Sequence, residues 1–105
     1  MITAKEARQL YNETVLLRDK YIEEVIEPLI KKTAPTSQSV TVEVKGGHSA
    51  RSINFPEPYA QNGVNIALTD LVTKMLIENG YKIHYLDGFG TKKHYSEGNL
   101  IISWE

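Results

Sequence analysis

The fold is decided by the stretch TAKEARQLYNETVLLRDKYIEEVIEPLIKK, residues 3–32. Its opening has the form of a capping box, in which the Thr3 hydroxyl accepts a hydrogen bond from the Glu6 amide and the Glu6 carboxylate accepts one from the Thr3 amide. Apolar residues then recur at three- and four-residue spacing, which predicts one long amphipathic helix from Ala4 to about Lys32. These apolar residues are Tyr11, Val15, Ile22, Val25, Ile26, Leu29 and Ile30, with Leu10, Leu17 and Tyr21 beside them.

Pro28 interrupts this helical pattern, because it removes a backbone hydrogen bond to Glu24. We expect a kink there or a break into two helices. An unbroken helix of about 28 residues would span about 42 Å. That length exceeds what a compact chain of this size needs, since its radius of gyration would be only about 13 Å.

An unbroken helix would expose an apolar face on its N-terminal half, and monomeric proteins usually cover such a face. The residues exposed there would be Leu10, Tyr11, Val15, Leu16 and Leu17. We therefore predict a homo-oligomer that associates through the face formed by Leu10, Tyr11, Val15 and Leu17. The alternative is that Pro28 folds the helix back into two shorter pieces on the same sheet.

The remaining elements follow from shorter patterns. Alternating apolar residues predict strands at 40–45, 51–55, 81–85 and 100–104, and a helical pattern at 64–78 predicts a second helix that Asn79-Gly80 ends. The last two strands pair most simply as an antiparallel hairpin. The order α-β-β-α-β-β predicts an α+β fold, with the long N-terminal helix and the second helix packed on a small antiparallel sheet. A length of 105 residues fits a single domain over residues 1–105.

The composition narrows the classes of function. A net charge of -1 argues against a general nucleic-acid binder, because phosphate contacts rely on clustered Lys and Arg, whereas a small anionic ligand is compatible with it. The chain has no cysteine, which removes disulfides and thiol nucleophiles. No apolar run approaches the roughly 18 residues of a membrane span, and the first residues do not have the form of a signal peptide. We therefore expect a cytoplasmic protein without membrane contact.

Two glycine-containing segments combine residue types that bind phosphate-bearing ligands. The first, residues 45–52, joins a flexible Gly46-Gly47 turn to cations and hydroxyls, which can wrap an anion and clamp it with Arg51. The second, residues 88–95, adds lysines for phosphates and aromatic rings for a base. The predicted ligand-binding residues are Lys45, His48, Ser49, Arg51, Phe89, Lys92, Lys93, His94 and Tyr95. The alternative for both segments is an ordinary hairpin turn with solvated polar residues.

Catalysis is the minority hypothesis. His48, His84 and His94 form no HxH or HExxH pair, so we expect no metal site and no cofactor. Ser49 and Ser52 are not in a GxSxG nucleophile elbow.

The layout of the chain also carries a resemblance. TAKEAR opens a long helix, a short valine strand follows, and NGYKI precedes a hairpin that ends in LIISW. This order resembles small accessory proteins of bacteriophages and prophages. Such proteins include sponges that sequester nucleotide immune signals, inhibitors of host proteins, regulators and virion components. The resemblance implies a binding function in the host cytoplasm, and it transfers no functional residue to this chain.

Three hypotheses follow from the residues and the resemblance together. The first is a homo-oligomeric anti-defence sponge that captures a small phosphate-bearing ligand, in which Arg51, Lys92 and Lys93 contact phosphates. The second is a protein-interaction module, either a host inhibitor or a virion component, that acts through the long helix. The third is a small hydrolase that uses the histidines.

Overall fold

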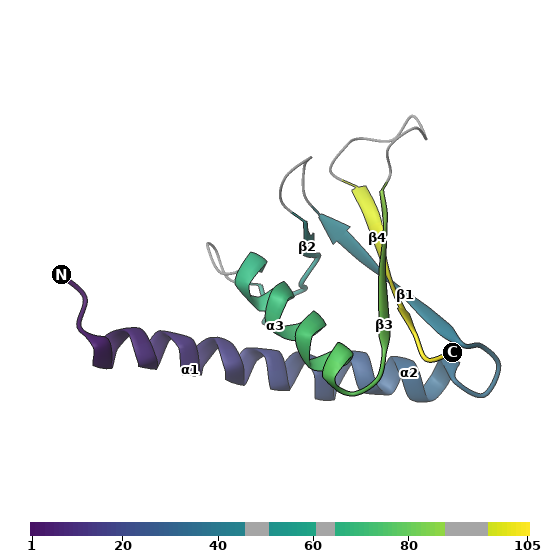
Figure 1. Ribbon diagram of the computed structural model, residues 1–105, viewed down its shortest axis with the longest axis horizontal. Coiled ribbons are helices and arrows are strands. Elements are labelled where there is room, and N and C mark those ends of the chain that lie inside the picture. The colour runs from purple at the N-terminus through teal and green to yellow at the C-terminus, as the bar shows by residue number, and fades with distance from the viewer. Residues whose placement is uncertain (46–50, 61–64, 88–96) are drawn as a thin grey trace.

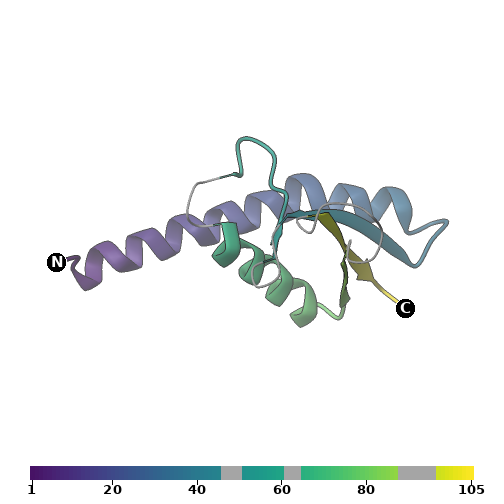
Figure 2. The same ribbon diagram turned by 90° about the horizontal axis from the view of Figure 1, so that it is seen from above.

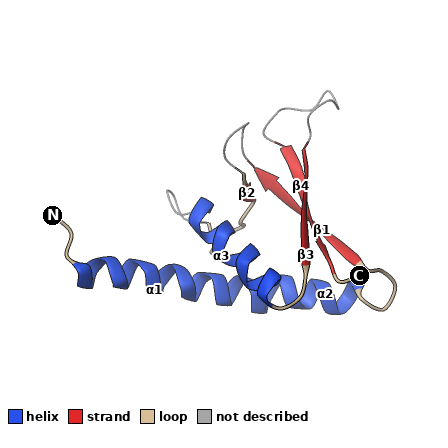
Figure 3. Ribbon diagram, viewed as in Figure 1, coloured by secondary structure: helices blue, strands red, loops and turns tan. Residues whose placement is uncertain are grey.

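The computed structural model describes residues 1–45, 51–60, 65–87 and 97–105. The elements follow one another as α1 (Ala4–Tyr21), η1 (Ile22–Ile26), α2 (Glu27–Thr33), β1 (Ser39–Lys45), β2 (Ser52–Ile53), α3 (Asn65–Glu78), β3 (Lys82–Asp87) and β4 (Glu97–Ser103). The long N-terminal helix and α3 pack on a four-stranded antiparallel sheet, so the predicted α+β fold and its order of elements are confirmed (Figures 1 and 3).

The start of α1 is capped by Thr3. Its hydroxyl accepts from the Glu6 amide at 3.2 Å, as the sequence predicts, and donates to the Glu6 carboxylate at 3.1 Å. The carboxylate therefore bonds to the Thr3 hydroxyl rather than to the Thr3 amide of the full capping box. One side chain still satisfies the first free amide of the helix, which is enough to start it at Ala4.

The helix does not break at Pro28. α1, η1 and α2 follow without a gap from Ala4 to Thr33 and form one rod, so the alternative in which the helix folds back is wrong (Figure 2). Instead, η1 is a π-helical segment in which the Glu27 amide donates to the Ile22 carbonyl, five residues earlier. The wider turn shifts the hydrogen-bond ladder, and Pro28 then falls in the first turn of α2, where its missing amide costs little.

The strands lie in the order β2-β1-β4-β3, all antiparallel. The predicted hairpin of the last two strands is confirmed by β3 and β4, which pair from Lys82↔Ser103 to Asp87↔Gly98. β1 pairs with β4 along its whole length. β2 is shorter than the predicted strand 51–55, because the Phe55 amide donates to the Ile53 carbonyl at 2.9 Å and this tight turn leads the chain away from β1.

α3 begins at Asn65, next to residues 61–64, which lie outside the described residues. It ends as predicted. Gly80 adopts φ +93°, and the Tyr81 amide donates back to the Leu76 carbonyl at 3.0 Å. This left-handed stop satisfies a carbonyl of the last helical turn and directs the chain into β3.

The core lies between the helices and one face of the sheet. Tyr21 is at its centre on the helical side, with its ring in edge-on contact with Phe55 at 4.9 Å and with Tyr59 at 5.2 Å between centroids. The fully buried apolar side chains from the other elements are Ile26, Ile53, Leu68, Val72, Leu100 and Ile102. The second half of the long helix is therefore anchored in the core, and this anchoring fixes the direction of the first half.

Candidate functional site

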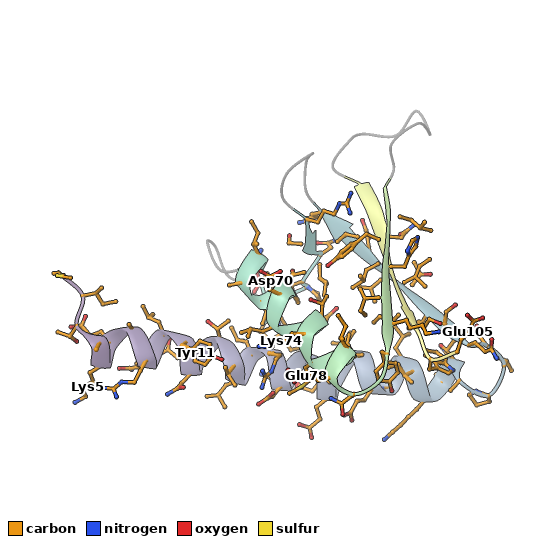
Figure 4. The ribbon with its side chains drawn as sticks, in the orientation of Figure 1. Lys5, Tyr11, Asp70, Lys74, Glu78 and Glu105 are labelled. Carbon is orange, nitrogen blue, oxygen red and sulfur yellow. The ribbon has the colours of Figure 1, made fainter. Side chains whose placement is uncertain are left out.

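The N-terminal part of α1 projects past the rest of the molecule. Residues 1–13 are all exposed, and Leu10, Tyr11 and Leu16 have 56%, 58% and 68% of their surface accessible. Figure 4 shows Lys5 and Tyr11 on this projecting half, away from α3. The molecule measures 47 × 33 × 23 Å with a radius of gyration of 14.9 Å, larger than the roughly 13 Å of a compact chain of this length.

A line of apolar side chains, which we call the apolar line, runs along both halves of α1. Over the second half it faces the core, where Tyr21 is 2% exposed and Leu17 packs against the buried cluster. The same line continues onto the projecting half through Ala4, Ala7, Leu10 and Tyr11, which we call the exposed stripe. Helical periodicity places these residues on one side of the helix, because they are three or four positions apart.

The structure divides the face that was predicted for self-association. Leu10 and Tyr11 belong to the exposed stripe, whereas Val15 and Leu17 are half-buried in the chain's own domain. Leu16 is exposed, but it follows Tyr11 by five residues, which places it about 140° around the helix. The accessible apolar surface is thus shifted towards the N-terminus relative to the predicted face.

Two shallow hollows lie along the long helix. One is beside the exposed stripe and is lined by Ile2, Glu6, Gln9, Leu10 and Glu13. The other lies between the helix and α3 and is lined by Asp19, Ile22, Glu23, Glu27 and Met75. The first hollow adds two carboxylates to one flank of the stripe.

Most of the predicted ligand-binding residues lie outside the described residues. These are His48, Ser49, Phe89, Lys92, Lys93, His94 and Tyr95. Lys45 and Arg51 are described, and both are exposed. Lys45 is the last residue of β1, opposite Ser52 of β2 and Glu97 of β4. β1 therefore ends beside the first residues of β2 and β4, so the strand ends that flank the two predicted loops lie at the same end of the sheet.

At this end of the sheet, the Arg51 guanidinium lies over an aromatic ring. Its guanidinium carbon is 5.4 Å from the ring centroid of Tyr85 in β3, a cation–π contact worth about 0.5–1 kcal/mol at an exposed site. Burial and the charge of Asp70 raise the pKa of the Tyr85 hydroxyl, while Arg51 and a hydrogen bond with Thr73 oppose the rise. The ring is therefore neutral at pH 7 and can orient the guanidinium, whose fork of N–H donors suits phosphate or carboxylate.

Tyr85 is the site residue that sequence reasoning missed. Its alternation with Ile83 identified it only as an inward-facing strand residue, which it is. Nothing in the local pattern links it to Arg51, because the two residues meet only through the order of the strands. Within the described ranges, no group of three or more His, Asp or Glu side chains could hold a metal ion.

None of the described helices is long and apolar enough to cross a membrane. Comparison with protein-family models, curated proteins and solved structures found no match to this chain.

Proposed function

We propose that the protein is an interaction module whose projecting half of α1 binds a helix of a partner protein. The observation that carries this proposal is the continuity of the apolar line. This line is buried at Tyr21, Ile22 and Ile26. It is exposed at Leu10 and Tyr11. A partner helix laid on the exposed stripe would extend the packing that the second half of the helix already makes with α3.

The energy available at the exposed stripe is enough for recognition. Fully burying a large apolar side chain is worth about 1.5–3 kcal/mol. Leu10 and Tyr11 are a little over half exposed, so covering them contributes about 1–2 kcal/mol each. Such anchors, placed near the centre of a small surface, have the character of interface hot spots.

The projecting half is also held ready for binding. An isolated helix of this length is marginal in water, because the first turn is costly to form. Here the Thr3 cap orders one end and the buried Tyr21, Ile22 and Ile26 anchor the other. Because the helix is already ordered, little conformational entropy is lost when a partner binds to it.

The test is photo-crosslinking in the cells that make the protein. A photoreactive benzoylphenylalanine replaces Tyr11, whose exposed ring it resembles. We expect a discrete adduct at Tyr11, whose mass identifies either a second copy or another protein. The matched control carries the same group at Lys74, which is exposed on α3 and lies away from the exposed stripe (Figure 4). Absence of any discrete adduct at Tyr11, or equal adducts at both positions, would contradict the proposal.

A second candidate function is the binding of a small phosphate-bearing ligand at the end of the sheet where β1 ends. The observation that favours it is Arg51, which lies over the Tyr85 ring and directly precedes Ser52, the residue that pairs with Lys45. Thermal shift against cyclic nucleotides and ADP-ribose derivatives tests it. We expect stabilisation by one class of ligand, which Arg51→Ala abolishes and Lys74→Ala retains. No stabilisation by any of these ligands would exclude this second function for the ligand classes tested.

A further inference from the structure

The exposed stripe follows a heptad spacing. Its central positions alternate three- and four-residue steps, which is the pattern of helices that pair along a seam. These positions, which we call the seam, are Ala4, Ala7 and Tyr11 of the exposed stripe and the half-buried Thr14 that follows it. Leu10 and Leu17 lie along one flank of the seam and Arg8 lies on the other. The seam thus has two alanines at its N-terminal end and larger side chains from Tyr11 onward.

The chain's own domain limits where a second helix can lie. From Thr14 onward the seam is at least partly covered, and the Arg18 side chain is only 18% exposed. α3 lies beside this second part of the long helix, whereas the described residues place no element along the first turns (Figure 2). A parallel copy of the chain would bring its domain to the same end as the first domain. An antiparallel copy places the two domains at opposite ends.

We infer that the partner on the exposed stripe is a second copy of this chain, with the two projecting halves antiparallel about a two-fold axis near Gln9. This inference rests on the proposed function and names its partner. Antiparallel pairing sets Tyr11 against Ala7 of the second copy and Thr14 against its Ala4, so that each larger side chain meets a smaller one. Leu10 meets its own counterpart across the axis.

A parallel pair fits these side chains less well. It would set Tyr11 against Tyr11 and Ala7 against Ala7, which crowds one layer and leaves a gap in the next. The charges also fit self-pairing. The projecting half carries Lys5 and Arg8 against Glu6 and Glu13, so two copies approach without net repulsion.

One contact opposes the antiparallel pair and provides a diagnostic variant. Arg8 lies on the flank opposite Leu10, and it meets its own counterpart near the axis. The overlap of about 13 residues, or about 20 Å, makes a small interface, for which we expect a dissociation constant in the micromolar range. Replacing the two like charges removes a repulsion, so Arg8→Gln should tighten the dimer by a few fold.

The experiment combines analytical ultracentrifugation with distance measurement between nitroxide labels. The natural chain has no cysteine, so one label per chain is introduced cleanly at Gln9→Cys or at Glu23→Cys, both exposed positions. Near the axis, the Gln9 labels should be about 20 Å apart, as set by the widths of two helices. The Glu23 labels should be about 42 Å apart along the pair, because 28 residues of helix rise separate them.

Two further variants separate pairing from folding. Tyr11→Glu should abolish the dimer with an unchanged circular dichroism spectrum, because the side chain is exposed in the single chain. Leu16→Glu is the matched control, since Leu16 is more exposed than Tyr11 but lies off the seam. It should leave the dimer intact. A dimer that survives Tyr11→Glu, or that Leu16→Glu dissociates equally, would overturn the assigned interface.

The remaining outcomes distinguish this inference from the proposed function. A monomer at roughly 100 μM, well above a micromolar dissociation constant, would overturn the second copy as partner. Short distances at both labels would overturn the antiparallel arrangement. If the chain is monomeric but Tyr11 crosslinks to a different protein, the interaction function stands and self-pairing fails. If no adduct forms at Tyr11 either, both fail.

Discussion

Replacing Thr69 with Val should destabilise the protein more than any other removal of a single hydroxyl from α3. Thr69 is 1% exposed, and its hydroxyl is shared between two backbone groups. It accepts from the Ile53 amide at 2.9 Å and donates to the Asn65 carbonyl at 2.8 Å. The first of these bonds ties β2 to α3.

The size of the effect follows from which group loses its partner. Val keeps the shape of Thr and also its β-branched character, so neither a cavity nor a large change in helix propensity contributes. The Ile53 amide, however, loses its acceptor in a buried position, which costs about 1–3 kcal/mol. The Asn65 carbonyl loses only an additional donor. We therefore expect a loss of about 2 kcal/mol in the free energy of unfolding.

Urea denaturation followed by circular dichroism measures this loss, and Thr73→Val is the matched control. Thr73 lies one turn further along α3, and its hydroxyl donates to the carbonyls of Thr69 and Asp70 at 3.0 and 3.1 Å. Its removal orphans no backbone amide and takes away a hydrogen bond with the half-buried Tyr85 hydroxyl, so we expect a smaller loss of no more than about 1 kcal/mol. In thermal unfolding, a loss of 2 kcal/mol corresponds to a decrease of roughly 8–16 °C in Tm.

Hydrogen exchange locates the effect. The Ile53 amide should lose protection in Thr69→Val by more than the amides of β4, which stay paired with β1. The reasoning fails if Thr69→Val and Thr73→Val have the same stability, or if the Ile53 amide keeps its protection relative to β4. Either result would mean that the buried hydroxyl does not hold β2 in place.

Two other predictions concern pH and the end of α3. Burial first, and the charge of Tyr59 second, raise the pKa of Tyr21 from 10.0 to about 12. The pKa of Tyr21 is therefore higher in the folded protein than in the unfolded one. The contribution of the neutral Tyr21 hydroxyl to stability is complete below pH 10 and is lost as the pH rises from 10 towards 12. Urea denaturation at pH 10 and at pH 12 should show that Tyr21→Phe loses less unfolding free energy over this range than the natural protein does. An equal loss in both proteins would refute the role of Tyr21. Gly80→Ala should cost about 1–2 kcal/mol through backbone strain alone, because φ is +93° and no atom lies within 4 Å of an added Cβ. Unchanged stability in the same denaturation assay would contradict this.

The parts of the fold that were predictable from sequence are those whose hydrogen bonds are local. Thr3 and Glu6 are three residues apart, and the bonds that start α1 lie between them. The end of α3 at Gly80 is equally local, since the Tyr81 amide reaches back five residues to Leu76. The hairpin of β3 and β4 followed from alternation and neighbourhood in the chain. Such features depend on residues that are close in the chain and not on tertiary packing.

Pro28 shows how tertiary packing overrides a local signal. By itself the proline favours a kink or a break, because one amide is missing and the ring crowds Glu24. In the structure, Ile22 and Ile26 are buried at the two ends of η1, just before Pro28. A break would withdraw one of them from the core at a cost of about 1.5–3 kcal/mol. The shift of one residue in the π-helical segment η1 instead accommodates the proline and keeps both in place.

The sequence by itself determined that a long amphipathic helix begins at Ala4 after the Thr3 cap, that its line of apolar residues extends through Leu10 and Tyr11, and that Lys45 and Arg51 flank a glycine-containing segment. Only the tertiary structure decided that Tyr21 anchors this line in the core while Tyr11 is exposed, and that Arg51 rests on Tyr85. The physical reason is how far apart in the sequence the interacting residues lie. Helix caps and periodicity depend on residues within one or two turns, whereas exposure and ring contacts depend on how α3 and the strand order close the core over part of the helix.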